Sequence, residues 1–205
     1  MTTPDGQQHS FTADRAPPLL HARPTAWEPP IDLFNGRDLD GWTSWPRGSE
    51  SHWVVRDGIL TNTASGANLV TTRTFDDFIL HVEFRYPAGG NSGIYLRGRH
   101  EVQIEDPPRR EWPEVIDLGG IYGFLAPNEA IEAKPGEWHS FEITLIGRRV
   151  TVILDGRTVI SDRIIPGITG GALDSNEGQP GPILLQGDHT GVEFRNVRLT
   201  PAARQ

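Results

Sequence analysis

"NSGIYLRGRHEVQIED", residues 91–106, alternates apolar and polar side chains along two short runs joined by a glycine-containing turn. Successive side chains of a β-strand point to opposite faces, so Ile94 and Leu96 share one side of the first run. Val102 and Ile104 share one side of the second run in the same way. The stretch therefore predicts a pair of strands with an apolar face for the core and an unusually polar second face.

The same alternation recurs along most of the chain from residue 31 onward. The predicted strands are 53–56, 58–62, 68–71, 78–86, 92–97, 101–105, 138–146, 149–154, 157–161, 181–186 and 191–199. Asp-Gly pairs at 57–58 and 155–156 favour tight hairpins, because both central residues of such turns must tolerate positive φ. More than ten strands exceed what one open sheet usually holds. The pattern therefore predicts an all-β, two-sheet antiparallel jelly-roll sandwich in which residues 106–137 and 163–180 are long loops.

The alternation also divides the side chains between the core and a second face. The predicted core residues are Leu80, Val82, Phe84, Ile94, Leu96, Val102, Ile104, Phe141, Ile143, Leu145, Val150, Val152 and Leu154. The opposite parity holds His81, Glu83, Arg85, Tyr95, Arg97, Glu101, Gln103, Glu105, Glu142 and Thr144. If these strands neighbour one another, they present a single polar and aromatic surface on which a ligand could bind.

Length and charge restrict the class of protein. A chain of 205 residues suits one domain, predicted over 29–205, preceded by a flexible leader over 1–28 that has few apolar residues. The formal net charge of -8 argues against a nucleic-acid partner, which needs a surplus of Lys and Arg. Without cysteine, disulfides, thiolate zinc sites and cysteine nucleophiles are excluded. No signal peptide or membrane span is recognisable, so we expect no membrane partner and a cytoplasmic location.

Several motifs occur in the order found in one known family. They are "LFNGRDLDGW" (33–42), "DGIL" (57–60), "NSGIYLRGRHEVQIED" (91–106), "GGIYG" (119–123), "KPGEWHSFEI" (134–143), "VTVILDGRTV" (150–159) and "GPILLQGDHTGVEFRNVRL" (181–199). Over about residues 31–200 the chain resembles the 3-keto-disaccharide hydrolase family. That resemblance implies a fold of the concanavalin A-like lectin/glucanase type and a carbohydrate substrate, a glycoside oxidised to a ketone at C3.

A ketone at C3 makes the hydrogen at C2 acidic. Removing that proton gives an enolate, and the group at C1 can then leave by β-elimination before water adds back. This chemistry needs a base near C2, donors for the C3 oxygen and an acid for the departing oxygen. A conventional glycosidase would instead need two carboxylates flanking the anomeric carbon, at a separation that sequence does not reveal.

Glu101 is the first candidate for the base, with Gln103 on the same face to orient a sugar hydroxyl. The alternative is a solvated strand face on which Glu101 pairs with Arg97 or Arg99. Arg97 is predicted to polarise the ketone or bind hydroxyls. His189, at a position where the family has a histidine, is predicted to be the acid or a donor. It lies in "QGDH", where Gly187 is inserted into the family's Gln-Asp-His.

Further residues are predicted to bind substrate. With Gln103, these candidates are Glu83, Tyr95, Asp106, Lys134, Glu142 and Gln186. Either Glu83 or Glu142 is an alternative base, Tyr95 could pack on a sugar ring, and Asp106 could instead cap a turn. Lys134 stands where the family has a lysine ahead of Gly-Glu-Trp.

Neither a phosphate- or dinucleotide-binding motif nor a metal-ligand motif is present, so no cofactor is expected. Clustered carboxylates leave Ca²⁺ open as an alternative. A non-catalytic, lectin-like carbohydrate-binding module is the rival function, because one jelly-roll fold serves both purposes. Ordinary hydrolysis of a polysaccharide is a third possibility.

Overall fold

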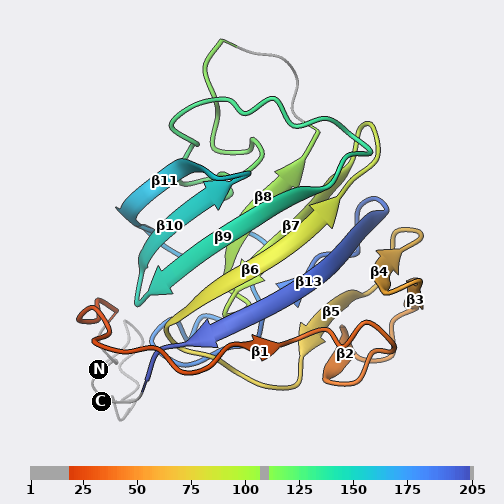
Figure 1. The fold of residues 1–205 in the computed structure, drawn as a ribbon, viewed down its shortest axis with the longest axis horizontal. Helices are drawn as coiled ribbons and strands as arrows, with labels where there is room; N and C mark the ends of the chain where they lie inside the picture. Colours follow the sequence, from red (N-terminus) through yellow and green to blue (C-terminus); the bar gives the residue numbers. More distant parts are fainter. Residues whose placement is uncertain (1–18, 107–110, 204–205) are drawn as a thin grey trace, which may run out of the picture.

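Two stacked antiparallel β-sheets make up the computed structural model, which describes residues 19–106 and 111–203 (Figure 1). The strands are β1 (Ile31–Asp32), β2 (Trp42–Trp45), β3 (Trp53–Arg56), β4 (Ile59–Asn62), β5 (Asn68–Thr71), β6 (Phe78–Arg85), β7 (Asn91–Leu96), β8 (His100–Glu105), β9 (His139–Ile146), β10 (Arg149–Leu154), β11 (Arg157–Ile164), β12 (Leu184–Leu185) and β13 (Val192–Pro201). The described residues contain no helix, and hence none long and apolar enough to cross a membrane.

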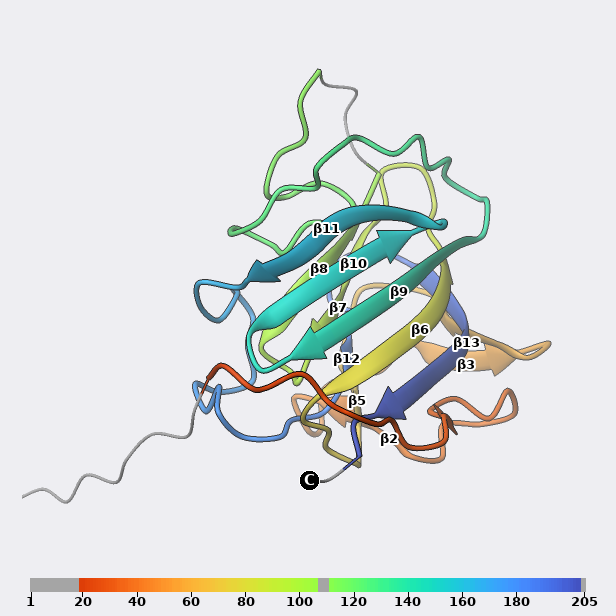
Figure 2. The ribbon, with the colours of Figure 1, turned by 60° about the vertical axis from the view of Figure 1, so that its left-hand side comes forward.

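The larger sheet has eight strands, in the order β11-β10-β9-β6-β13-β4-β3, with β1 also paired to β13. The smaller sheet has five strands, in the order β2-β5-β12-β7-β8. Figure 2 shows the large sheet in front of the small one. The arrangement confirms the predicted all-β, two-sheet antiparallel sandwich. It also adds two strands that the alternation did not predict, β1 of two residues and β2 of four.

Apolar side chains from both sheets fill the space between them. Every predicted core residue is fully buried. Phe84 of β6 and Phe141 of β9 stack with their ring centroids 4.6 Å apart. Burying one such side chain stabilises a fold by roughly 1.5–3 kcal/mol, so the alternation read from the sequence identifies the residues that hold the sheets together.

Left-handed backbone conformations form the tight turns. Asp57 and Gly58 have φ of 52° and 77°, and Asp155 and Gly156 have φ of 48° and 78°, which confirms both predicted Asp-Gly hairpins. A third turn of this kind joins β7 to β8, where Arg97 and Gly98 have φ of 53° and 67°. Arg97 therefore lies outside the strand, and the alternation ends before it.

Two long loops fold against the small sheet. The first, described over 111–138, pairs with the outer edge of β8, where the backbone amide of Gln103 donates to the Gly120 carbonyl at 2.9 Å. The second, 165–183, returns to the β7–β8 turn, where the Leu173 amide donates to the Gly98 carbonyl at 2.8 Å. Both loops are thereby fixed beside the polar face of β7 and β8.

The chain ahead of β1 runs along the large sheet. The Arg148 amide donates to the Leu19 carbonyl at 2.9 Å, and the Glu28 amide donates to the Pro201 carbonyl at 2.9 Å. Residues 1–18, where most of the predicted flexible leader falls, lie outside the described residues.

Candidate active site

The outer face of the small sheet brings polar side chains from three strands together. Ile94 and Leu185 point into the core, so the residues beside them point outward. Gly93 on β7 pairs with Gln103 on β8, and its backbone carbonyl accepts a hydrogen bond from the backbone amide of Gln186 at 2.9 Å. We call Gln186, Gly93 and Gln103 the amide row. The neighbouring row contains Leu184 of β12, Tyr95 of β7 and Glu101 of β8.

Gly93 makes room for the carboxyl group of Glu101. A Cβ atom at Gly93 would lie 2.3 Å from Oε1 of Glu101, so any larger residue there would displace the carboxyl group. The Tyr95 hydroxyl lies 2.9 Å from Glu101 Oε2 and 2.9 Å from the Gly170 carbonyl oxygen. The Glu101 amide donates to Thr169 Oγ1 at 3.0 Å. The carboxyl group is thus held over β7, and Oε1 accepts no hydrogen bond from a described residue.

Burial perturbs the acidity of Glu101. The residue is only 3% exposed. Loss of water raises the pKa of this carboxyl, the hydrogen bond from Tyr95 lowers it, and the charge of Asp188 raises it, giving a value of about 7. A carboxyl group with this pKa accepts and returns protons near neutrality, which suits a general base. Burial and the adjacent carboxylate raise the pKa of Tyr95, so its hydroxyl stays a donor.

Two buried amide side chains flank this carboxyl group. Gln103 is 2% and Gln186 is 7% exposed, and Oε1 of each has no hydrogen-bond partner among the described residues. Gln103 Nε2 donates to Glu105 Oε2 at 3.4 Å. An unsatisfied buried polar atom costs roughly 1–3 kcal/mol, so a ligand that hydrogen-bonds to these amides recovers that free energy. The amide row therefore has the chemistry of a site for sugar hydroxyls.

His189 lies in the turn that follows the amide row. Its Nδ1 is 2.7 Å from Oδ1 of Asp188, and both side chains are about half exposed. Burial raises the pKa of both Glu101 and Tyr95, and the charge of Asp188 raises both further. The inserted Gly187 fits a tight space, since a Cβ there would lie 2.5 Å from the Ala67 carbonyl oxygen.

The structure does not bring Arg97 to Glu101. The Arg97 side chain is 1% exposed, with Nη2 donating to the Gly147 carbonyl at 2.6 Å and Nη1 to Asp76 Oδ1 at 3.2 Å. Arg99 donates from Nε to Asp174 Oδ1 at 2.7 Å. The alternative in which Glu101 pairs with either arginine is therefore wrong, because the left-handed turn and the loops direct both guanidinium groups elsewhere.

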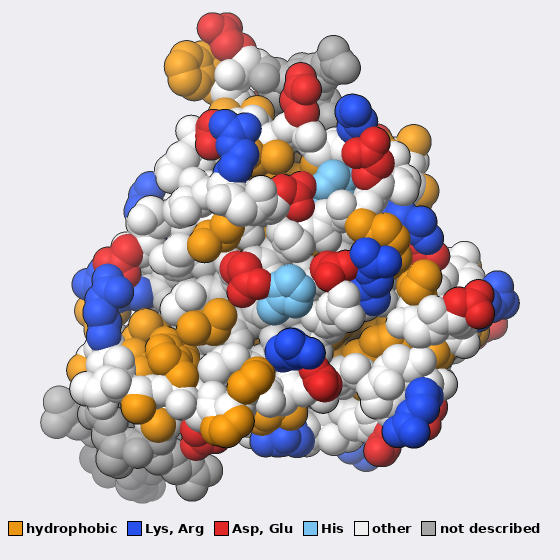
Figure 3. Space-filling view, viewed as in Figure 1, with side chains coloured by type: hydrophobic (Ala, Val, Ile, Leu, Met, Phe, Trp, Pro, Cys, Tyr) orange, Lys and Arg blue, Asp and Glu red, His pale blue; other side chains and the backbone are white. Residues whose placement is uncertain are grey.

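Glu83 and Glu142 lie on the large sheet, on the opposite outer face of the molecule. Glu83 accepts hydrogen bonds from Arg195 Nε and Asn196 Nδ2, each at 2.6 Å. Glu142 is hydrogen-bonded to His81 Nδ1. Figure 3 views this face and shows acidic, basic and histidine side chains interspersed on it. The expectation of one continuous polar surface is wrong, because the strands concerned belong to two different sheets.

Two further candidates, Asp106 and Lys134, contact residues other than Glu101. Asp106 Oδ2 accepts a hydrogen bond from the Gly89 amide at 2.8 Å, which is the turn-capping alternative. Lys134 is exposed, and its Nζ lies 3.9 Å from Glu137 Oε1.

Sequence reasoning missed Tyr122 and Asp188. The Tyr122 amide donates to the Glu101 carbonyl at 3.0 Å, and its ring is exposed. A Cβ at Gly170 would lie 3.9 Å from that ring. Tyr122 falls in a loop without periodicity, so only its place in the "GGIYG" motif pointed toward it. Asp188 could have been suspected because it directly precedes His189.

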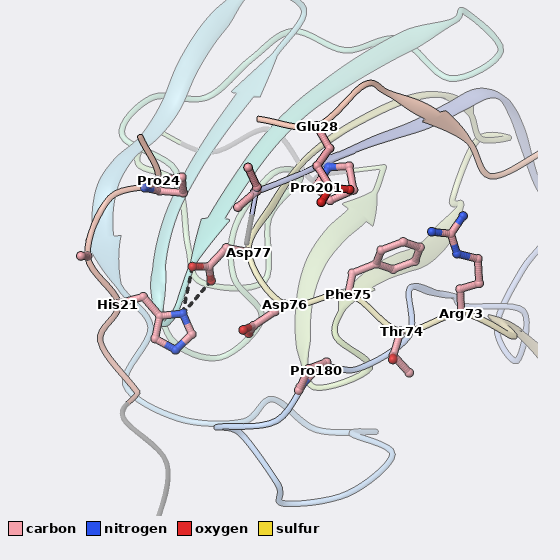
Figure 4. Close-up of a pocket in the computed structure, with 13 residues that line it drawn as sticks. His21, Pro24, Glu28, Arg73, Thr74, Phe75, Asp76, Asp77, Pro180 and Pro201 are labelled. Carbon is pink, nitrogen blue, oxygen red and sulfur yellow. Dashed lines mark hydrogen bonds and ion pairs between the residues drawn. The ribbon is translucent and has the colours of Figure 1, made fainter. Parts of the chain in front are cut away.

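A separate cavity of about 690 Å³ opens beside the start of β6, between the N-terminal segment and residues 73–77 (Figure 4). Ligand atoms of His21, Asp76 and Asp77 lie within 4.8 Å of one another there. His21 Nδ1 and the Gly147 amide both bond to Asp77, at 2.9 and 2.7 Å. These carboxylates thus already have partners, and Ca²⁺ prefers six to eight oxygen ligands. With the base and the amides elsewhere, the amide row and not this cavity is the candidate active site.

Comparisons with known proteins identify the family of this chain and agree with the fold. Residues 29–200 match the family model of the 3-keto-alpha-glucoside-1,2-lyase-like domain. A 3-keto-disaccharide hydrolase of Bacteroides thetaiotaomicron is 27% identical over 118 residues, 52% of this chain and 40% of that protein. The chain therefore matches less than half the length of that relative.

Solved structures extend this similarity to the whole fold. A proposed glycosyl hydrolase from Parabacteroides distasonis superposes with a TM-score of 0.72 at 29% identity, over 97% of this chain and 98% of that one. A lichenase from a mouse hindgut metagenome gives a TM-score of 0.51 at 14% identity, over 85% of this chain and 98% of that one. The second likeness concerns the fold alone, and it confirms the jelly roll.

Proposed function

Because this chain belongs to the 3-keto-alpha-glucoside-1,2-lyase-like family, we propose that it cleaves the glycosidic bond of 3-keto-glycosides by elimination and rehydration. The observation that carries the proposal is the carboxyl group of Glu101, buried over Gly93 with a pKa raised to about 7. A base of this strength is matched to a C2 proton that the neighbouring ketone has made acidic.

In the first step Glu101 takes the proton from C2, and the electrons of that C–H bond form an enolate on the C3 oxygen. In the second step the C1–O bond breaks, a C1–C2 double bond forms and the C3 ketone returns. Water then adds its hydroxyl group to C1 while C2 regains a proton. The net reaction is hydrolysis, and no oxidant or reductant is consumed.

The neighbouring residues supply the other requirements of this scheme. Gln186, whose side chain is buried in the row beside Glu101, donates to the developing oxyanion at C3 in this scheme. Gln103 binds a sugar hydroxyl through its unpartnered Oε1. His189, held at 2.7 Å by Asp188, protonates the departing oxygen. Arg97 has no part in the scheme because its guanidinium group is bonded to Asp76 and Gly147.

Deuterium incorporation tests the proposal directly. The protein is incubated in D₂O with a 3-keto-disaccharide and, separately, with its unoxidised parent. We expect cleavage of the keto sugar alone, with deuterium entering at C2. Glu101→Gln should abolish both cleavage and C2 exchange, whereas Glu193→Gln, a matched change at a carboxylate that pairs with Arg85 on the large sheet, should leave them unchanged.

Other outcomes would identify the rival functions. Binding without release of either sugar would favour the non-catalytic carbohydrate-binding module. Release from the unoxidised parent without C2 exchange would favour ordinary hydrolysis. Full activity of Glu101→Gln would remove that residue from the role of base.

A further inference from the structure

The amide row continues across the small sheet beyond the residues assigned above. Asn68 on β5 pairs with Trp45 on β2. Leu69, next to Asn68, points into the core, so Asn68 and Trp45 point to the outer face that Gln186 also occupies. The register therefore sets Trp45, Asn68, Gln186, Gly93 and Gln103 in one line that crosses all five strands.

This line extends from Glu101 in one direction only. β8 is the edge strand, and the loop over 111–138 already occupies its outer edge through hydrogen bonds at Gln103 and Tyr122. On the other side of β7 lie three more strands, which span roughly 14 Å at the usual strand spacing. That length exceeds a single sugar ring, so a second unit attached at C1 has sheet beneath it only toward β2.

Asn68 and Trp45 have the chemistry to hold such a unit. Asn68 Oδ1 accepts a hydrogen bond from the Gly187 backbone amide at 2.7 Å, so the orientation of its side-chain amide is fixed, and Nδ2 has no hydrogen-bond partner among the described residues. Trp45 is 39% exposed. An exposed indole beside a fixed amide donor suits a sugar ring, whose C–H face packs on the aromatic ring while a hydroxyl accepts the hydrogen bond.

The loop over 165–183 defines one side of this position. Leu173 packs against Val70, Tyr95 and Leu184 in the adjacent row. That row is thereby covered by an apolar cluster. The row with Asn68 and Trp45 is the one that keeps an exposed aromatic ring.

We propose that Trp45 and Asn68 form a second sugar-binding position, which takes the departing sugar unit of a disaccharide whose oxidised ring lies at Glu101. This inference rests on the proposed function for the identity of the departing unit. It makes the protein selective for glycosides whose leaving group is itself a sugar.

The test compares two substrates, the 3-keto derivative of an α-linked glucose disaccharide and methyl 3-keto-α-glucoside, which lacks the second ring. Trp45→Ala should lower kcat/KM for the disaccharide about tenfold, equivalent to roughly 1.4 kcal/mol, and leave the methyl glycoside unchanged. Trp45→Phe should retain most of the activity. Trp27→Ala, at a similarly exposed tryptophan on the large sheet, is the matched control and should change neither substrate.

Asn68→Asp keeps the oxygen that binds the Gly187 amide and removes the donor. This change should also lower kcat/KM for the keto disaccharide and leave kcat/KM for the methyl glycoside unchanged. If Trp45→Ala lowered kcat/KM equally for both substrates, or for neither of them, the inference would be overturned.

Calorimetric titration with the unoxidised disaccharide and with methyl α-glucoside separates this inference from the proposed function. Disaccharide binding that is independent of Trp45 would overturn the second position whether or not either keto sugar is cleaved. If Trp45→Ala weakened binding of the disaccharide but neither keto sugar was cleaved, the second sugar-binding position would be supported and the proposed reaction refuted.

Discussion

Glu101→Gln should make the protein more stable above neutral pH while removing its activity. The folded-state pKa of Glu101, about 7, lies above the ordinary value of 4.5, so between these values the folded state binds more protons than the unfolded state. Stability therefore falls as pH rises through that window. At 1.36 kcal/mol for each tenfold change, the difference amounts to about 3 kcal/mol once Glu101 is ionised. A neutral glutamine of nearly the same shape avoids this cost.

Urea unfolding of both proteins at pH 5 and pH 8 measures the effect. At pH 8 we expect Glu101→Gln to exceed the wild-type free energy of unfolding by about 3 kcal/mol, and at pH 5 by less than about 1 kcal/mol. Glu105→Gln, at the partly exposed end of the same strand, should show no such difference. Equal pH dependence in Glu101→Gln and wild type would refute the claim that burial holds the carboxyl group protonated.

Three further substitutions probe the surroundings of Glu101. Tyr95→Phe removes a hydrogen bond that lowers the pKa of Glu101, so the rising limb of kcat/KM against pH, near 7 in wild type, should move to higher pH; an unmoved limb would contradict the assignment. Gly93→Ala places a Cβ 2.3 Å from Oε1 of Glu101 and should lower kcat/KM about 100-fold, since displacing a catalytic group by about 1 Å costs this much; normal turnover would show that the carboxyl group need not lie over β7. Arg97→Gln removes a buried guanidinium group that donates to the Gly147 carbonyl and to the half-exposed Asp76, and it should cost roughly 1–3 kcal/mol in urea unfolding, with kcat/KM of the folded protein unchanged; a loss of turnover at full stability would return Arg97 to the active site.

Glu101 shows why burial and function are linked in this fold. Its ionised form is disfavoured by the same lack of water that makes it a strong base near neutrality. A site that only binds sugars gains nothing from this cost. The burial of this carboxyl group therefore supports the proposed proton transfer over recognition alone.

The local sequence pattern was sufficient to predict part of the fold. The alternation identified the residues that close the core, and the Asp-Gly pairs at 57–58 and 155–156 identified two hairpins. Both follow from the geometry of a single strand or turn. The pairing of Tyr95 with Glu101 likewise needed only the hairpin in which both occur.

The sequence by itself determined which side of each strand faces the core, because side-chain direction alternates within one strand and needs no partner. Only the tertiary structure decided which strands share a sheet, because pairing joins segments separated by long loops. Because of this pairing, Glu83 and Glu142 lie on one outer face and Glu101 lies on the other. The pairing also brought Gln186 beside Gly93, and the carboxyl group of Glu101 fills the space over that glycine, where burial raises its pKa.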